Sequence, residues 1–235
     1  MEILNLKITY QKRPILSRRI YEPKLSNTFF SLTFFEIVLT SIQLKRASLI
    51  RTFLAIELPR PLLLKIEEVL GDLRSSQADV RWVNPENLHL TIKFFGNIDE
   101  SKIEPIVQSV DRLVQETPAI LLRVKGMGAF PNLRNPRVIW LGFSEGKESL
   151  NSFQKKLERE FKKIGFSPEE RPFHPHLTLG RMRSSRGKED LLRRMERYRE
   201  EEFGEIQAEK VILFKSDLRP SGPIYTPLRE IRLGG

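Results

Sequence analysis

From Arg51 onward, the apolar residues follow two periods in turn, one near two residues and one near 3.6. A period near two predicts a strand, and a period near 3.6 predicts an amphipathic helix. Strands are predicted at 51–58, 87–95, 119–127, 137–143, 174–181, 206–217 and 224–232. Helices are predicted at 61–74, 100–116, 146–164 and 187–202. Helices mixed with pairs of adjacent strands favour an α+β fold over a doubly wound parallel sheet.

The first fifty residues have a different pattern. Two basic pairs, Lys12-Arg13 and Arg18-Arg19, precede the apolar stretch 29–44, which Glu36 interrupts. This stretch lacks the continuous apolar segment and small-residue cleavage site of a signal peptide. We therefore expect residues 1–49 to be a poorly ordered N-terminal extension and residues 50–235 to form the folded domain.

Composition narrows the class of protein. The chain has 235 residues, of which 40% are hydrophobic and 30% charged, and it has no cysteine. Disulfides, thiolate nucleophiles and cysteine-ligated metal sites are thereby excluded. We expect a cytoplasmic protein that does not cross a membrane. The formal net charge of +10 favours a polyanionic partner such as nucleic acid, although a solvated basic surface would give the same count.

The most informative feature is a repeated tetrapeptide. His89-Leu90-Thr91-Ile92 returns, nearly unchanged, as His176-Leu177-Thr178-Leu179, and these two motifs use two of the three histidines in the chain. Both copies lie in predicted strands, where residues two apart share a face. Each strand would therefore bury its leucines and present one imidazole and one hydroxyl on its other face. In the first copy, the apolar face is expected to carry Leu88, Leu90, Ile92 and Phe94.

Paired imidazoles and hydroxyls suit phosphoryl transfer. A neutral imidazole can accept a proton from an attacking water, while a protonated one donates a proton to the leaving oxygen. The threonine hydroxyls can donate hydrogen bonds to the non-bridging phosphate oxygens. A single His-x-Thr is more often an ordinary strand segment, but its repetition favours a catalytic pair, His89 and His176, with Thr91 and Thr178 as phosphate ligands.

Other chemistries have weaker support. Two histidines on separate strands without nearby carboxylates make a poor catalytic metal site, so we expect no metal and no cofactor. The sequence has no Gly-x-x-x-x-Gly-Lys-Ser/Thr loop, no Gly-x-Gly-x-x-Gly turn and no Gly-x-Ser-x-Gly elbow. Nucleoside triphosphate, dinucleotide and α/β-hydrolase sites are therefore not indicated.

The sequence resembles the two-histidine (2H) phosphoesterases, and within them the RNA 2′,3′-cyclic phosphodiesterases, also called 2′-5′ RNA ligases. Besides the two motifs, the resemblance rests on the segments 51–56, 81–83, 136–140, 175–181 and 216–225. It covers residues 51–233. It implies a bilobal duplicated fold of two small, mostly antiparallel sheets with outer helices around a central cleft.

The resemblance also implies an activity. The enzyme would hydrolyse a terminal RNA 2′,3′-cyclic phosphate to a 2′-phosphate without a metal, and could form 2′-5′ linkages in reverse. His89 would be the general acid and His176 the general base. Thr91, Thr178 and Arg181 would bind the phosphate. The expected partner is RNA with a cyclic phosphate end, tRNA fragments being one candidate, and the expected state is a monomer.

Two residues close to the second motif, Arg181 and His174, raise questions that the sequence leaves open. Simple strand alternation places Arg181 on the face opposite His176, so its role requires the strand predicted at 174–181 to twist or end near Gly180. His174 shares the parity of His176, but Pro175 limits its geometry, which favours an orienting role over a direct one. We expect Trp82 and Trp140 to fill the core rather than to stack on bases.

Two alternatives remain. One is a different 2H phosphodiesterase that cleaves 2′-5′ oligoadenylate or a cyclic nucleotide, which the motifs do not distinguish. The other is a non-catalytic RNA-end binding module. Two intact proton-transfer groups argue against simple binding.

Overall fold

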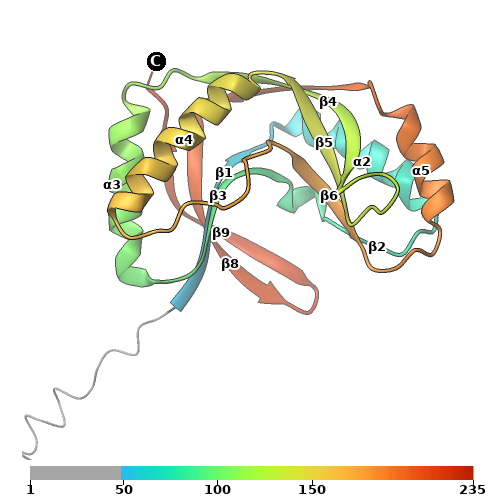
Figure 1. Cartoon of the computed structure of the whole chain (residues 1–235), viewed down its shortest axis with the longest axis horizontal. Helices are drawn as coiled ribbons and strands as arrows, with labels where there is room; N and C mark the ends of the chain where they lie inside the picture. Colours follow the sequence, from blue (N-terminus) through green and yellow to red (C-terminus); the bar gives the residue numbers. More distant parts are fainter. Residues whose placement is uncertain (1–48, 235) are drawn as a thin grey trace, which may run out of the picture. The chain divides into compact units, whose positions relative to one another are not determined.

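The structure is a computed structural model that describes residues 49–234, and these fall within one compact unit (Figure 1). Residues 1–48 of the predicted N-terminal extension lie outside the described residues. Leu49, the last residue of that prediction, already belongs to the first strand.

The unit contains nine strands and four α-helices in the described part of the chain. The strands are β1 (Leu49–Glu57), β2 (Val80–Trp82), β3 (His89–Asp99), β4 (Ile120–Phe130), β5 (Val138–Glu145), β6 (Leu177–Met182), β7 (Glu202–Ala208), β8 (Lys210–Arg219) and β9 (Gly222–Arg232). The helices are α2 (Arg60–Arg74), α3 (Ile103–Val114), α4 (Lys147–Lys163) and α5 (Lys188–Arg197). Short 3-10 turns, Pro85–Asn87 and Glu100–Lys102, precede β3 and α3.

All strand pairs are antiparallel, and the strand order is β7-β4-β5-β6-β3-β1-β8-β9, with β2 paired to β6. The order has two halves. The His89 half contains β3, β1, β8 and β9, and the His176 half contains β6, β5, β4, β7 and β2. The two halves meet where β3 pairs with β6 at the single register position Leu90–Leu177. This arrangement confirms the expected α+β fold with antiparallel halves and shows that they join into one sheet.

The helices are divided between the halves. Helices α3 and α4 pack together beside the His89 half, although α4 also contacts β4 and β5, whereas α2 and α5 lie beside the His176 half (Figure 1). Buried apolar residues of all four helices belong to the main core, together with Leu54, Leu90 and Leu177 of the sheet. Phe53 and Ala55, which alternate with Leu54 along β1, belong to a separate small cluster on the other face. The sheet therefore has one face that the helices cover and one that they leave open.

Most predicted elements are present. The strand predicted at 174–181 begins only at Leu177, so His174 and His176 precede it, and three further elements differ. The strand predicted at 206–217 is two strands, β7 and β8, interrupted at Glu209. The helix predicted at 187–202 ends at Arg197, because the chain turns there to enter β7. The three-residue strand β2 was not predicted, since a segment so short has too few positions to show alternation.

Candidate active site

The two histidine motifs cross at the junction of the halves. Leu90 and Leu177 are direct partners and are both fully buried, so they point to the helix-covered face. The residues on either side of each leucine must then point to the opposite face. That face carries His89, Thr91, His176 and Thr178 around one crossing point, and it is called the motif face below.

The register also sets the separation of the two histidines. In an antiparallel pair centred on Leu90–Leu177, His89 and His176 are diagonal neighbours. Diagonal neighbours have α-carbons about 8 Å apart. Two imidazoles at this spacing can lie on either side of a single phosphate.

His89 is held by its backbone surroundings and by aromatic rings. Its Nδ1 lies 2.8 Å from the carbonyl oxygen of Asn87, which can only accept a hydrogen bond, so Nδ1 carries the proton. The ring packs 4.7 Å from that of Phe53 and edge-on at 5.2 Å from that of Tyr225. This leaves Nε2 as the nitrogen available for proton transfer.

His176 is held in the same way. Its Nδ1 donates to the carbonyl oxygen of His174 at 2.7 Å, again two residues earlier in the chain. Its ring lies edge-on to Phe130, with 5.0 Å between centroids. The side chain of His174 is exposed, so the orienting role expected for His174 fits its backbone carbonyl.

Both histidines are biased towards the neutral form. Burial lowers the pKa of His89 below its ordinary value because desolvation penalises the imidazolium, and the bond to Asn87 offsets only part of this. Burial also lowers the pKa of His176, and the positive charges of Arg181 and His174 lower it further. His176 therefore has electrostatic reasons to stay neutral that His89 lacks.

A β-bulge places Arg181 on the motif face. Trp140 of β5 pairs with Thr178, but its neighbour Ile139 pairs with Gly180, so Leu179 is an extra residue in β6. Val138, two residues before Trp140, pairs with Arg181. Arg181 thus shares a face with Thr178, and the objection from simple alternation is removed because the bulge re-aims the side chain.

The first motif has a matching bulge. Ala55 pairs with Thr91 and Leu54 with Lys93, which makes Ile92 the extra residue in β3. Lys93 is turned into the helix-covered side, where it forms a 2.9 Å ion pair with Glu158 of α4. Phe94 is turned to the motif face opposite Phe53. The expectation that Phe94 would share the face of the motif leucines is therefore wrong.

The expectation that Trp140 fills the core is also wrong. Trp140 is half-buried on the face of Thr178, and its indole lies so close to Gly128 and Gly142 that a Cβ added at either would meet it at 2.4 or 3.1 Å. Small residues on both sides let the ring lie flat on the sheet. Trp82, by contrast, packs against the main core as expected.

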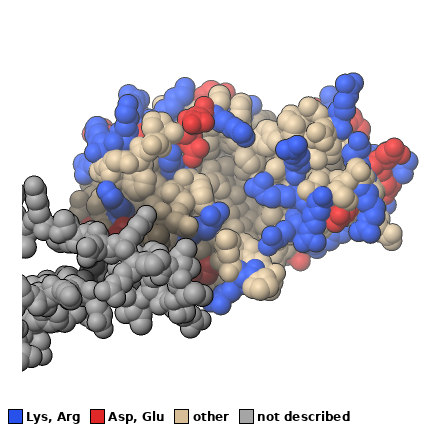
Figure 2. Space-filling view, turned by 60° about the horizontal axis from the view of Figure 1, so that its bottom comes forward, with Lys and Arg blue, Asp and Glu red and all other residues tan. Residues whose placement is uncertain are grey.

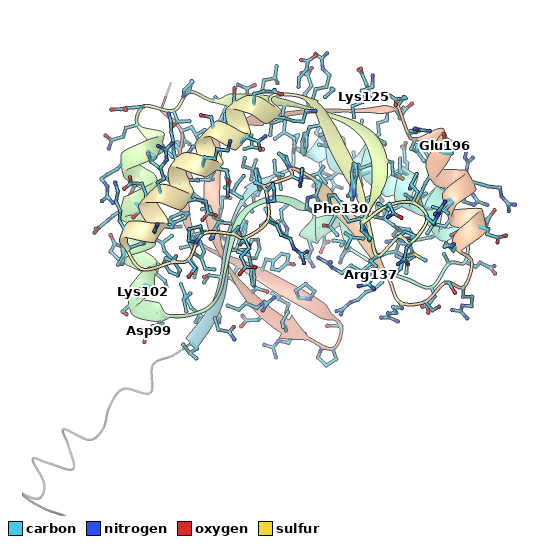
Figure 3. All side chains as sticks on the ribbon, in the orientation of Figure 1. Asp99, Lys102, Lys125, Phe130, Arg137 and Glu196 are labelled. Atoms are coloured by element: carbon cyan, nitrogen blue, oxygen red, sulfur yellow. The ribbon has the colours of Figure 1, made fainter. Side chains whose placement is uncertain are left out.

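A pocket of about 660 Å³ adjoins His176. Its walls include Phe130, Trp140 and His174, with Lys125 and Arg199 among its charged residues. In Figure 3, Phe130 lies near the centre of the molecule and Lys125 lies farther back along the same strand, β4. His89 does not line this pocket, which therefore extends from the His176 side of the crossing.

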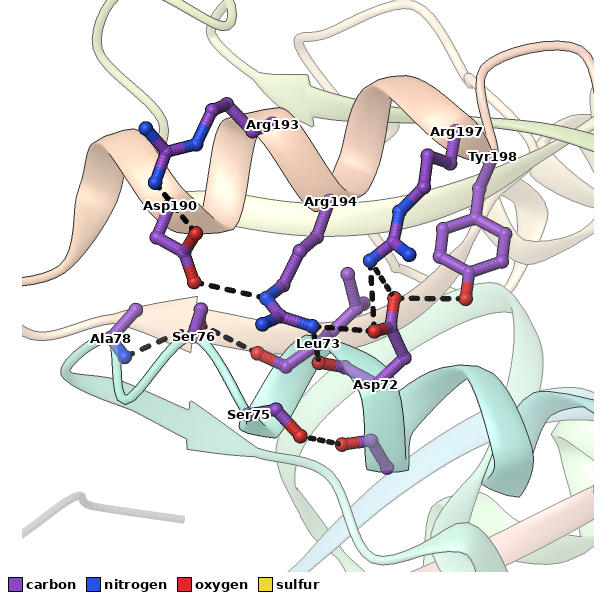
Figure 4. A network of polar contacts seen from close by, with 11 residues as sticks. Asp72, Leu73, Ser75, Ser76, Ala78, Asp190, Arg193, Arg194, Arg197 and Tyr198 are labelled. Atoms are coloured by element: carbon purple, nitrogen blue, oxygen red, sulfur yellow. Dashed lines mark hydrogen bonds and ion pairs between the residues drawn. The ribbon is translucent and has the colours of Figure 1, made fainter.

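The basic helix α5 is largely occupied by structural contacts. Asp72 of α2 accepts hydrogen bonds from Arg194, Arg197 and Tyr198 at 2.6 to 2.9 Å, which ties α5 to α2 (Figure 4). Burial alone would raise the pKa of Asp72, but these three hydrogen bonds outweigh it and hold the pKa below its ordinary value. Much of the positive charge of α5 thus stabilises the fold.

Sequence reasoning missed several residues of the site. Phe53 and Tyr225 pack on His89, and Arg51 and Arg81 also lie on the motif face. Strand alternation from Phe53 to Arg51 was a usable signal for β1. Tyr225 and Arg81 lie in segments that carry the family resemblance, but alternation does not place them, because they reach the motif face through pairing between distant strands.

Two further observations concern the part of the chain that the structure describes. No group of three or more histidine or acidic side chains there is arranged to hold a metal ion. No helix among residues 49–234 is both long and apolar enough to cross a membrane.

The fold and the paired motifs define a two-histidine phosphoesterase. The family model for LigT-like phosphoesterases matches residues 56–140 and again residues 141–225, so each match contains one motif. The chain belongs to this family of enzymes.

Individual relatives agree. The RNA 2′,3′-cyclic phosphodiesterase of Methanothermobacter thermautotrophicus is 38% identical over 184 residues, which is 78% of this chain and 99% of the relative. That of Methanocaldococcus jannaschii is 36% identical over 77% of this chain and 99% of its own length. The crystal structure of TT0787 of Thermus thermophilus aligns with a TM-score of 0.67 at 27% identity, covering 79% of this chain and 98% of that protein.

Proposed function

We propose that this phosphoesterase is an RNA 2′,3′-cyclic phosphodiesterase that hydrolyses the terminal cyclic phosphate to a 2′-phosphate, with His176 as general base and His89 as general acid. The observation that carries the proposal is the crossing of the two motifs at Leu90–Leu177, which gathers two imidazoles and two hydroxyls on one face. The names and high coverage of the relatives support RNA cyclic phosphate as the substrate.

The proposed reaction breaks one bond and forms one. Neutral His176 accepts a proton at Nε2 from a water whose oxygen attacks the phosphorus. The P–O3′ bond breaks, and protonated His89 donates its Nε2 proton to the departing O3′. The hydroxyls of Thr91 and Thr178 and the guanidinium of Arg181 hold the non-bridging oxygens, where negative charge builds up.

The electrostatics support this division of roles. A base must be neutral before the reaction, and the charges of Arg181 and His174 favour neutral His176. An acid must be protonated, and burial lowers the pKa of His89 in the free enzyme. A bound anionic phosphate would raise the pKa of both imidazoles, but the charges of Arg181 and His174 oppose this increase at His176 only. Because the Nδ1 of each ring is bonded to a carbonyl, each Nε2 is kept in position for its task.

The principal test uses the three histidines. His89→Ala and His176→Ala should each lower kcat for RNA ending in a 2′,3′-cyclic phosphate by roughly 10² or more, as expected for a lost acid or base. His174→Ala removes a side chain that lines the pocket but keeps the backbone carbonyl that orients His176, so its loss should be much smaller, about fivefold or less. Near-normal hydrolysis by either of the first two variants, with thermal unfolding unchanged, would refute the catalytic assignment.

Further measurements address the finer points. Identification of the product distinguishes a 2′-phosphate, which the proposal requires, from a 3′-phosphate. Excess chelator should leave the rate unchanged; inactivation that added metal reverses would instead favour a metal mechanism. Faster cleavage of 2′-5′ oligoadenylate or cyclic nucleotides than of cyclic phosphate ends would favour the other 2H activity. The 2′-5′ ligase reaction, the monomeric state and the cytoplasmic location stay predictions.

A further inference from the structure

Arg51 has a defined place on the motif face, although the proposed reaction does not use it. On β1 it shares a face with Phe53, and its guanidinium carbon lies 4.4 Å from the centroid of the Phe94 ring. Phe94 is five residues after His89, as Arg181 is five residues after His176, and matching bulges turn both to the motif face. Arg181 thus provides a guanidinium beside the second motif. Beside the first motif, Phe94 takes the equivalent position, and Arg51, which packs on Phe94, provides the guanidinium.

Arg81 joins this group from a third strand. It is the direct cross-strand partner of Arg181 in the β2–β6 pair, and direct partners in an antiparallel pair project from the same face. Tyr225, which packs on His89 and Phe53, lies close enough to all three guanidiniums for their positive charges to lower the pKa of its hydroxyl, against a larger increase caused by burial. The three arginines thus lie on the motif face within electrostatic range of Tyr225, which packs on His89.

The charges of this group have no acidic partner among residues 49–234. Among the described residues, neither an ion pair nor a side-chain hydrogen bond is formed by Arg51, Arg81 or Arg181. The arginines of α5, by contrast, are paired with Asp72 and Asp190. Figure 2 shows Lys and Arg side chains gathered around a hollow in the surface. Like charges without partners repel one another, so their convergence favours an anionic ligand.

One phosphate does not account for three guanidiniums. The proposed reaction assigns Arg181 to the reacting phosphate, beside Thr178. An RNA strand supplies a second anion nearby, the phosphodiester on the 5′ side of the terminal nucleotide. A mononucleoside 2′,3′-cyclic phosphate has no such group.

We propose that Arg51 and Arg81 form a second phosphate subsite, which binds the phosphodiester preceding the terminal nucleotide and makes the enzyme selective for RNA ends over mononucleoside cyclic phosphates. The inference rests on the proposed function. It differs from that function in concerning the choice of substrate rather than the chemical step.

The test compares two substrates that end in the same nucleoside 2′,3′-cyclic phosphate, one a mononucleoside and the other a dinucleotide. The wild-type kcat/KM should be roughly tenfold or more higher for the dinucleotide, since charge-assisted bonds to phosphate are strong. A dinucleotide with an uncharged methylphosphonate linkage should lose this advantage. The advantage should also fall with increasing salt, more steeply than the rate for the mononucleoside.

Variants then locate the subsite. Arg51→Gln and Arg81→Gln should lower kcat/KM for the dinucleotide roughly tenfold and for the mononucleoside by less than threefold. Arg181→Gln should lower both to the same extent. Arg159→Gln, on the exposed side of α4, is the matched control and should change neither.

The outcomes separate the two proposals. If the wild type hydrolyses both substrates equally well, or if Arg51→Gln and Arg81→Gln lower both rates alike, the second subsite is refuted while the proposed function stands. If the wild type hydrolyses neither substrate, the proposed function itself fails. Thermal unfolding of each variant verifies that the fold is retained, as expected for Arg51, Arg81 and Arg181, whose side chains form no ion pair or hydrogen bond within residues 49–234.

Discussion

Replacement of Arg181 by glutamine tests whether the bulge at Leu179 brings this side chain to the reacting phosphate. Strict alternation along β6 would turn Arg181 away from His176, whereas the observed pairing of Val138 with Arg181 places it beside Thr178. Only in the second case does its guanidinium contact the substrate. The variant keeps hydrogen-bonding ability and approximate length but removes the charge.

The expected size of the effect follows from the contact that is lost. A hydrogen bond to a charged group contributes roughly 1.5–3 kcal/mol, and each ~1.4 kcal/mol corresponds to a factor of ten in rate. Arg181→Gln should therefore lower kcat/KM by roughly 10- to 150-fold. Arg181→Lys keeps the charge but loses the planar fork, so its loss should be smaller.

The assay is steady-state hydrolysis of a mononucleoside 2′,3′-cyclic phosphate, which has a single phosphate. Thr178→Val serves as the positive comparison, because it removes a hydroxyl from the same face with little change in shape. Arg159→Gln again serves as the matched charge control. If Arg181→Gln stays within twofold of wild type while Thr178→Val loses activity, Arg181 points away from the phosphate and the inference from the bulge is wrong.

Two other predictions concern pH and stability. The pKa of both histidines is lowered in the free enzyme, and catalysis needs one protonated and one neutral ring. The value of kcat/KM should therefore peak below about pH 6.5 and fall towards higher pH, because the acid loses its proton. A maximum above pH 8 would contradict the assignment. Asp72→Asn should lower the free energy of unfolding at pH 7 by about 2 kcal/mol, because bonds from two arginines to a carboxylate are weakened. Since the pKa of Asp72 is lowered in the folded protein, its contribution is present above the unfolded pKa of about 3.9 and is lost as pH falls further. The difference between wild type and Asp72→Asn in urea unfolding should thus shrink towards pH 2, and an equal difference at both pH values would show that ionised Asp72 is not its source.

Local sequence carried the repeated motif and most of the elements. The alternation around each motif indicated which side chains share a face, and the fully buried Leu90 and Leu177 follow that pattern. The amphipathic pattern of 61–74 likewise matches α2, whose buried residues are Leu62, Ile66, Val69, Leu70 and Leu73. These features depend on neighbours within a few residues, so they can be read without knowledge of the partner strands.

The positions of Arg181 and Phe94 could not be read in this way. A bulge exists only relative to a partner, since it appears when two residues of one strand face one residue of another. Alternation within β3 and β6 therefore predicted the wrong face for both residues. The position of Trp140 was wrongly predicted for a related reason. Its ring lies over Gly128, its cross-strand partner, and over Gly142, two residues later on β5, and the first of these depends on strand pairing.

What the sequence by itself determined is the chemistry available: two imidazoles and two hydroxyls on strands with buried leucines, in an α+β chain. Only the tertiary structure decided that these groups meet, because the crossing at Leu90–Leu177 joins residues 87 positions apart. It also decided which nitrogen of each histidine is free, since the carbonyls of Asn87 and His174 engage Nδ1. The physical reason is that alternation is a property of one strand, whereas register, bulges and the gathering of charge depend on pairs of strands.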